Sequence, residues 1–233
     1  MDNYNSVSSG REHETVNDPL VKIEQAIWQS LVRAGVDARH PWRWPVLSTV
    51  SQSAPETLRP PCVSGRILVL RKAQAKPSQL MFYTDKRSQK VQDIRKVPHV
   101  CFTFWDPKKM QQVRLAGDAT IVEEGDLWEE HFNCLSKRSW GDYAADHPPG
   151  TVIERADPYV QDRKNDGTII NNVEKGELND SLLTKKVREN FTLLVVKAKE
   201  IDWLHLRRSG HIRARIIYSV DSTSPVRRSF IEP

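Results

Sequence analysis

The sequence lacks the marks of a membrane or secreted protein. No apolar run approaches the ~20 residues that a membrane-spanning helix needs, and the polar stretch of residues 1–18 has no apolar core of a signal peptide. The cysteines, Cys62, Cys101 and Cys134, are few and widely spaced, with no CxxC pair. This pattern favours free thiols in a reducing compartment over a disulfide framework. We therefore predict a cytoplasmic protein that does not contact a membrane.

The common signatures of catalysis are also missing. There is no GxGxxG, no Walker loop, no HExxH and no GxSxG. The seven histidines show no metal-ligand spacing, and no serine or cysteine nucleophile stands with an evident base. The sequence therefore assigns neither a metal site nor a catalytic residue.

The chain does carry an excess of basic residues. It has 233 residues, a net charge of +5 and a pI near 9.1, which allows one large domain or two small ones. Such a charge suits either nucleic acid or a pocket for small anions. Because the basic residues lie at the ends of apolar runs, as Arg66, Arg71 and Lys90 do, the small anion is the preferred interpretation and nucleic acid is ranked low.

Residues 65–117 have the clearest pattern. Apolar runs rich in β-branched and aromatic residues at 66–71, 80–84 and 100–105 are bounded by turn residues, which is typical of strands. The run at 111–119 alternates, with Val113 and Leu115 on one face and Gln112 and Arg114 on the other, as in a half-buried strand. Arg and Lys at strand ends suit a phosphorylated ligand laid across a sheet.

The rest of the chain predicts further strands and a few helices. Asp18-Pro19 should start a helix that ends at Gly35, Ser88 should cap a helix over 89–96, and 125–140 should be helical, whereas the prolines of 41–45 should prevent a helix. Further strands are predicted at 46–50, 191–196, 201–206, 211–218 and 227–231. Residues 1–17 are interpreted as a disordered tail, and the charged segment 154–189 as a flexible insertion. The result is a mainly β, α+β fold: one domain over 18–233, built as an antiparallel split or closed barrel with flanking helices.

The predicted strand at 211–218 places three basic side chains on one face. His211, Arg213 and Arg215 alternate with apolar Ile212 and Ala214. Like charges on one face repel one another unless an anion lies between them. A solvated face is the alternative, but we favour an anion site here because the strand should be internal.

These elements, in this order, resemble the pyridoxamine 5′-phosphate oxidase-like flavoproteins, which are FMN-binding split barrels. The resemblance covers about residues 41–218, without the charged insertion. It is strongest at His-Pro-Trp-Arg-Trp-Pro, residues 40–45, and at Gly-His-Ile-Arg-Ala-Arg, residues 210–215. It implies a homodimer that completes two FMN sites at its interface, and an oxidoreductase in which the flavin carries the redox chemistry.

The resemblance also implies which residues bind FMN. Arg66 and Lys90 match family positions that hold the flavin and its phosphate, and Gln112 matches a glutamine near the ring. A family arginine is replaced by Gln89, and Arg87 is a candidate substitute. The implied cofactor-binding residues are Arg66, Leu68, Val69, Arg71, Tyr83, Thr84, Arg87, Ser88, Gln89, Lys90, Gln112 and Arg215.

The substrate side departs from the family. The implied substrate-binding residues are Arg71, His131, Ser139, His211 and Arg213. A family arginine that holds the substrate phosphate falls on Leu135, and the late Arg-x-His is reversed here. We therefore expect a small anionic substrate and weak or no oxidation of vitamin B6 phosphates. The alternative is a flavin- or haem-binding carrier or sensor without turnover, because a fold alone does not settle function.

Overall fold

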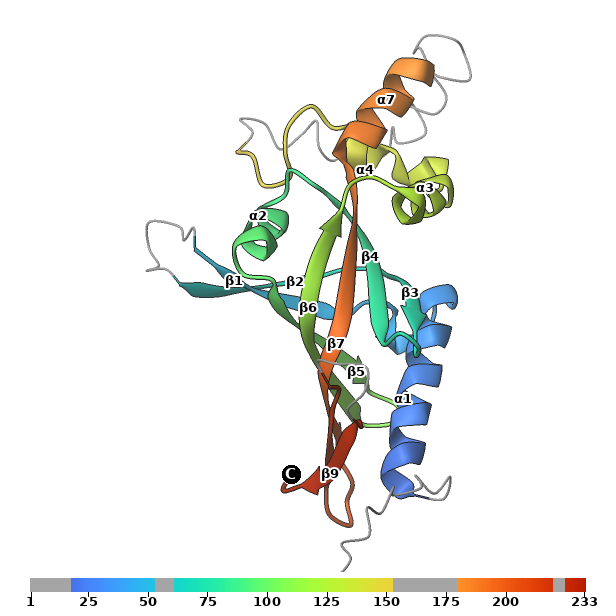
Figure 1. Cartoon of the computed structure of the whole chain (residues 1–233), viewed down its shortest axis with the longest axis vertical. Helices are drawn as coiled ribbons and strands as arrows, with labels where there is room; N and C mark the ends of the chain where they lie inside the picture. The colour runs from blue at the N-terminus through green and yellow to red at the C-terminus, as the bar shows by residue number, and fades with distance from the viewer. Residues whose placement is uncertain (1–17, 53–60, 153–179, 220–224) are drawn as a thin grey trace, which may run out of the picture.

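The structure is a computed structural model that describes residues 18–52, 61–152, 180–219 and 225–233 (Figure 1). The predicted tail at 1–17 and most of the predicted insertion lie outside these ranges. Within them the chain forms the following elements: α1 (Pro19–Val36), η1 (Pro41–Arg43), β1 (Val46–Ser51), β2 (Cys62–Ile67), β3 (Leu70–Gln74), β4 (Gln79–Asp85), α2 (Gln89–Lys96), β5 (His99–Asp106), β6 (Gln111–Val122), α3 (Asp126–Asn133), η2 (Lys137–Ser139), α4 (Gly141–Ala144), α7 (Asp180–Asn190), β7 (Phe191–His205), β8 (Ile212–Ile217) and β9 (Arg227–Ile231).

The strands form one antiparallel sheet of nine. Its order is β2-β1-β5-β6-β7-β4-β3, and β8 and β9 extend it from β7. This is the α+β split barrel that the sequence predicts. Figure 1 shows an elongated molecule in which α1 runs along one side of the sheet, while α3, α4 and α7 gather at one end.

The long strand β7 is where the barrel splits. One edge of β7 pairs with β6 along most of its length. Its other edge pairs with β4 over residues 191–197 and then with β8 over 200–205. Lys199 is an extra residue between these two stretches, because Ala116 pairs with Glu200 while Gly117 pairs with Ala198. A β-bulge of this kind bends a strand, and here it lies where one neighbour of β7 replaces the other.

Helix α1 begins as predicted and ends close to the predicted residue. The Asp18 carboxylate accepts a hydrogen bond from the Leu20 backbone at 2.8 Å, and Pro19 occupies the first helical position. At its far end, the Arg43 guanidinium donates to the carbonyls of Ala34 and Gly35. Arg43 itself lies in η1, one 3₁₀ turn in the segment that the prolines were expected to keep free of helix.

Four predicted elements differ from the observed ones. The helix predicted over 125–140 is shorter: α3 ends at Asn133, and η2 is a separate 3₁₀ turn. The run at 66–71 is split into β2 and β3, because the Leu68 amide leaves the ladder and donates to the Pro45 carbonyl at 3.1 Å. The two strands predicted at 191–196 and 201–206 form one continuous strand, β7. The charged residues between them belong to this strand, and Lys199 forms its bulge. Residues 180–189, predicted as loop, form most of α7, whose side chains Leu183 and Val187 are buried.

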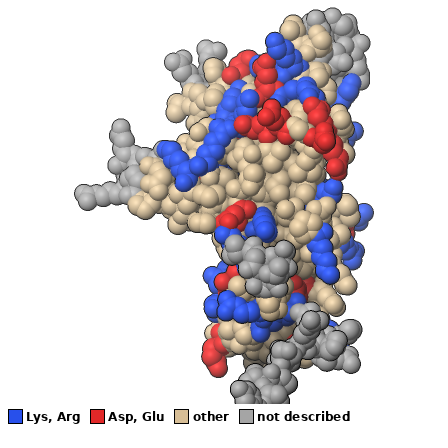
Figure 2. Space-filling model, in the orientation of Figure 1, with Lys and Arg blue, Asp and Glu red and all other residues tan. Residues whose placement is uncertain are grey.

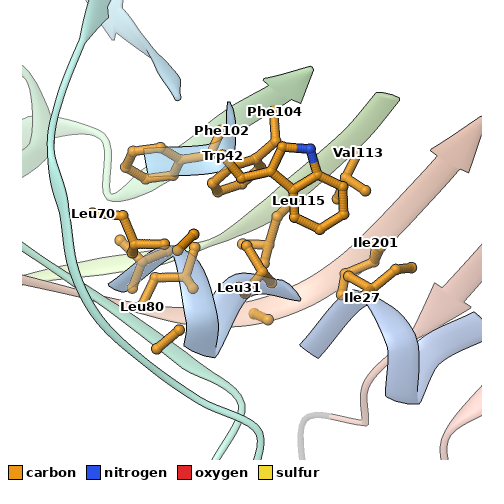
Figure 3. Close-up of a cluster of buried hydrophobic side chains, with 14 of the residues drawn as sticks. Ile27, Leu31, Trp42, Leu70, Leu80, Phe102, Phe104, Val113, Leu115 and Ile201 are labelled. Atoms are coloured by element: carbon orange, nitrogen blue, oxygen red, sulfur yellow. The ribbon is translucent and has the colours of Figure 1, made fainter. Parts of the chain in front are cut away.

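Two apolar clusters lie on opposite faces of the sheet. The larger one fills the barrel and includes Leu31 of α1, Trp42 of η1 and Phe102 and Leu115 of the sheet, as Figure 3 shows. The second covers the outer face of β4 and β7, where Trp128, Phe132, Tyr143 and Val187 surround Phe191. Successive residues of β4 therefore face different environments: Phe82 and Thr84 point into the barrel, and Tyr83 points toward the second cluster.

Candidate functional site

A polar cluster occupies the α2 end of the barrel. The Arg66 guanidinium on β2 donates to Thr49 Oγ1 at 2.6 Å and to Ser64 Oγ at 2.7 Å. The Lys90 ammonium on α2 donates to Thr84 Oγ1 on β4 at 3.1 Å. Three of the residues implied by the resemblance, Arg66, Thr84 and Lys90, are thus brought together from three elements.

A buried carboxylate organises this cluster. Asp93 is only 1% exposed and accepts hydrogen bonds from Thr49 Oγ1 at 3.1 Å, Ser51 Oγ at 2.9 Å and Gln89 Nε2 at 3.0 Å. Its Oδ2 also lies 3.8 Å from Arg66 Nη2. Since Thr49 in turn accepts from Arg66, the carboxylate and the hydroxyl together fix the direction of the guanidinium.

The charges of this cluster fit an anionic group. Burial, followed by the nearby Arg66 guanidinium, lowers the pKa of Lys90. Among the described residues, no carboxylate lies within ion-pair distance of the Lys90 ammonium. A half-buried ammonium beside a second cation and several hydroxyls suits a phosphate group, which would neutralise both. These residues therefore fit the phosphate of a flavin mononucleotide.

The neighbouring residues of the predicted site have other partners. Arg87 is held by the Asp85 carboxylate, with 2.7 Å between Nη2 and Oδ2, and donates to the Ala145 carbonyl. Ser88 donates through its hydroxyl to the Asp85 carbonyl at 2.7 Å, and Gln89 is bonded to Asp93. Leu68 and Val69 form the link between β2 and β3, and Leu68 packs against the barrel core.

A second group of predicted residues lies on the outer face of β3 and β4. The Arg71 guanidinium carbon lies 5.1 Å from the centroid of the Tyr83 ring, and the Tyr83 hydroxyl lies 2.9 Å from His131 Nδ1 of α3. Burial raises the pKa of Tyr83 to about 12, and burial lowers the pKa of His131. Both side chains are therefore neutral at neutral pH.

Leu135 and Ser139 differ in their surroundings. Leu135 is buried in the second apolar cluster, to which Tyr83 also packs. Ser139 lies in η2 at the surface, with its hydroxyl 3.5 Å from that of Ser136. The structure thus brings together Arg71 and His131, two of the predicted substrate residues, on either side of Tyr83. The hydroxyl of Ser139 lies instead next to Ser136.

The remaining predicted residues lie at the other end of the sheet. The Arg213 guanidinium on β8 is paired with the buried Asp202 carboxylate of β7, 2.7 Å from Nη2 to Oδ2, and Arg114 of β6 reaches the same carboxylate. Burial opposes ionisation of Asp202, but hydrogen bonds from Arg213 and Arg114 hold its pKa below the usual range. Arg215 Nε lies 3.2 Å from a Glu200 carboxylate oxygen.

The basic side chains of Arg213 and Arg215, for which the sequence predicted an anionic ligand, are therefore paired with the carboxylates of Asp202 and Glu200 on β7. A sequence pattern read one strand at a time could not reveal this pairing. His211 lies just before β8, and its Nδ1 accepts from the Arg207 amide at 3.2 Å. Gln112 is at the start of β6, opposite Leu204.

A long distance separates the two ends of the predicted site. Thr84 pairs with Thr192 and Arg215 pairs with Asp202 along the same strand, β7. The two partners are 202 − 192 = 10 residues apart, which at a strand rise of about 3.3 Å per residue is roughly 30 Å. Thr84, to which Lys90 is bonded, and Arg215 therefore lie at opposite ends of the sheet.

Two residues of the polar cluster were missed by the sequence analysis. Thr49 is only one of several hydroxyl residues of β1, and Asp93 resembles any charged residue of a short helix. A weak signal does exist for Asp93, because it lies four residues after Gln89 and hence on the same helical face. Its burial depends on the packing of α2 over β1, which the local sequence does not show.

The charged surface has two regions. Figure 2 shows a run of Lys and Arg side chains over the part of the molecule where Figure 1 places α2. Acidic side chains gather near α3, where Glu123, Glu124 and Glu129 line a cleft of about 930 Å³ together with Trp128 and Arg188. None of the predicted site residues lines this cleft.

Comparison with known proteins finds a family similarity over part of the chain. Residues 25–123 match the family model described as pyridoxamine 5′-phosphate oxidase, FMN-binding domain. This range holds Arg66, Thr84, Lys90 and Gln112. The matched range is less than half of the chain; together with the split-barrel fold, it supports a flavin-binding domain similar to those of the pyridoxamine 5′-phosphate oxidase family.

Solved structures share the fold across most of the chain. A pyridoxamine 5′-phosphate oxidase-related, FMN-binding protein from Nostoc punctiforme has 22% sequence identity and a TM-score of 0.63, covering 90% of this chain and 96% of its own. PhzG from Burkholderia lata, solved in complex with tetrahydrophenazine-1-carboxylic acid, has 11% identity and a TM-score of 0.61, covering 94% and 95%. No curated protein matches the chain.

Proposed function

We propose that this protein binds FMN and is an FMN-dependent oxidoreductase acting on a small anionic substrate. The observation that carries the proposal is the Arg66–Lys90 cation pair, which lies inside the family-matched residues and has hydroxyls around it. In this proposal Arg66, Thr84 and Lys90 hold the FMN phosphate, with Thr49 and Asp93 orienting Arg66. The bound flavin would supply hydride transfer at its ring.

We further propose that the active form is a homodimer in which each flavin is held by two chains. The separation of roughly 30 Å along β7 supports this assignment, because Gln112 and Arg215 reach a flavin only if they belong to the other chain. Exposed apolar side chains also support it. Val63 and Ile67 on β2 are 76% and 62% exposed, and Ile67 lies directly opposite the exposed Val46 of β1. A second copy of the chain would cover this patch.

The substrate would lie against the outer face of β4, where Arg71 and His131 meet. The same substrate would be approached by Arg213 and His211 of the second chain. The protein's task in this scheme is to bind and orient the substrate beside the flavin. No general base is needed for the flavin to accept a hydride, and we assign none.

A cytoplasmic location is part of the proposal. All three cysteines are free, which suits a reducing compartment. Among the described helices, none is both long enough and apolar enough to cross a bilayer.

The test begins with the purified protein and its absorption spectrum. We expect a yellow protein that releases FMN, and no FAD, on denaturation. The apoprotein should regain the flavin spectrum on titration with FMN. A colourless protein that takes up no added FMN would exclude the proposal. Turnover is tested separately, by reducing the bound flavin with candidate substrates without oxygen. A flavin that no anionic substrate reduces would instead support a carrier or sensor.

A further inference from the structure

The Arg71 side chain is a cation without an anion. Its Nε atom is buried and has no hydrogen-bond partner, and in the described part of the chain no carboxylate lies within ion-pair distance of its guanidinium. Its guanidinium carbon lies 5.1 Å from the centroid of the Tyr83 ring. The neighbouring cation, Lys72, does have an anionic partner, because its ammonium lies 2.9 Å from a Glu130 carboxylate oxygen. A partly buried guanidinium that lacks a partner is costly unless a ligand supplies one.

His131 offers a second unused polar atom beside it. This side chain is 4% exposed, and its Nδ1 is bonded to the Tyr83 hydroxyl. Its Nε2 is buried without a partner. Because the Tyr83 hydroxyl keeps its proton at neutral pH, it can donate to Nδ1, and the imidazole proton then resides on Nε2. An anion beside Arg71 would favour that arrangement and accept the Nε2 hydrogen bond.

The charge of this group is small. Lys72 is neutralised by Glu130, and the nearby Arg43 already donates to the carbonyls at the end of α1. Leu135 stands at the position where the family carries an arginine for phosphate, and it is buried among aromatic side chains. What remains is one guanidinium and one neutral N–H donor beside the partly buried Tyr83 ring and the second apolar cluster. We name Arg71, Tyr83, His131 and Leu135 the Arg71 cluster.

We propose that the Arg71 cluster binds the carboxylate of an aromatic or other apolar monoanion, in preference to a phosphate ester. A guanidinium fork matches the two oxygens of a carboxylate, and the apolar side chains match a ring attached to it. A phosphate dianion would bring a second charge that no cation of the cluster offsets. This inference rests on the proposed function, in which the cluster faces the substrate, and it narrows the substrate class.

The test compares two ligands with the same aromatic ring by calorimetric titration of the FMN-loaded protein. Naphthalene-1-carboxylate and 1-naphthyl phosphate share their ring and differ in the anionic group. We expect the carboxylate to bind at least 10-fold more tightly. An equal or reversed preference, or no binding of either ligand, would overturn the proposal.

Variants locate the site. Arg71→Leu should weaken the carboxylate at least 10-fold, and His131→Phe should weaken it by a smaller factor. Lys72→Met is the matched control and should leave both dissociation constants unchanged. An unchanged affinity in Arg71→Leu would place the ligand elsewhere and refute the assignment.

A gain-of-function variant completes the set. Leu135→Arg should improve phosphate-ester binding at least 10-fold and shrink the preference for the carboxylate. If that buried substitution prevents folding, His131→Gln, which keeps an N–H donor, should retain more carboxylate affinity than His131→Phe. Titration of the apoprotein with FMN is run in parallel. If the apoprotein does not bind FMN, the proposed function is wrong. The heat of carboxylate binding is measured in a separate titration and tests the substrate class alone.

Discussion

At the scale of single residues, the molecule places its predicted cations in unlike surroundings. Lys90 and Arg66 are partly buried, near each other and beside hydroxyls. Arg213 and Arg87 are already paired with carboxylates of the same chain. The same residue type therefore has a different capacity for ligand at each position, and substitutions should separate the positions that bind from those that are structural.

Removal of the Lys90 charge should weaken flavin binding. We expect Lys90→Met to raise the dissociation constant for FMN about 10- to 100-fold, because a charge-assisted hydrogen bond to phosphate contributes about 1.5–3 kcal/mol. Fluorescence quenching of FMN on titration with apoprotein measures it. Arg87→Gln is the control and should change the constant less than 3-fold, about 0.6 kcal/mol, because Asp85 and Ala145 already hold that guanidinium. A larger effect of Arg87→Gln would mean that this arginine does replace the one lost at Gln89.

The lowered pKa of Lys90 predicts a pH dependence. The ammonium is charged below its pKa, and burial places that pKa beneath the ordinary lysine value of 10.5. As pH rises through the lowered pKa, Lys90 loses its charge and FMN affinity should fall. The phosphate is already a dianion above about pH 7, so it adds no slope there. In Lys90→Met this decline should disappear. A wild-type affinity that stays constant up to the ordinary lysine pKa would contradict the prediction.

Loss of the Asp93 carboxylate should destabilise the fold. Asp93→Ala removes the buried carboxylate that accepts from Thr49, Ser51 and Gln89 and lies beside Arg66, so we expect the free energy of unfolding to fall by about 3 kcal/mol or more. Urea denaturation monitored by circular dichroism measures it. Glu130→Ala, which removes an exposed partner of Lys72, should cost less than about 1 kcal/mol. Equal losses in the two variants would show that Asp93 is not the organising group.

At the scale of elements, the sequence shows best what depends on local pattern. The Asp18-Pro19 start of α1 and the alternation of β6 each follow from local pattern, and each is observed. The helix predicted over 125–140 is observed only in its first part, as α3. The continuity of β7 was missed because a bulge interrupts its period at Lys199. Helix α7 was missed because Leu183 and Val187 are its main buried apolar residues, too few to outweigh its charges.

The candidate site divides in the same way. Its cations could be predicted from strand ends and from the family resemblance. Their partners could not, because Asp93, Asp202 and Glu200 reach them across the sheet or from a helix packed above it. Which strands pair is set by the topology of the fold, so the sequence of one strand does not predict the charged residues on the strand beside it.

Helix α7 offers a test of its packing. Val187 is fully buried in the second apolar cluster, and Leu182 is 64% exposed. We expect Val187→Ala to lower the free energy of unfolding by about 2 kcal/mol, from the loss of two buried carbons and the cavity left behind. Leu182→Ala should change it by less than about 0.5 kcal/mol. A comparable loss at both positions would argue against the observed orientation of the helix.

At the scale of the whole molecule, the separation of Lys90 from Arg215 allows a test of the proposed homodimer. Variants Lys90→Met and Arg215→Gln damage opposite ends. Each should bind FMN weakly as a homodimer. A mixed dimer has one site with both damaged ends and one with neither, so it should bind one FMN per dimer with the affinity of the wild type. Differently tagged chains, coexpressed and purified through both tags, provide this species for titration. Absence of any restored site, or a monomer that binds FMN tightly, would show that each chain holds its own flavin.

The bulge of β7 has a mechanical consequence for such a dimer. A side chain at Gly117 would bring its Cβ to 2.2 Å from the Lys197 carbonyl oxygen, so the two strands approach each other there as only glycine allows. Asp202, the β7 partner of Arg215, lies four residues beyond Ala198, or about 13 Å. A rotation of about 5° at the bulge would therefore displace Arg215 by about 1 Å, an error that can cost a reaction about 100-fold. In the proposed dimer, the position of Arg215 relative to the flavin of the other subunit would therefore depend on the close approach of the two backbones at Gly117.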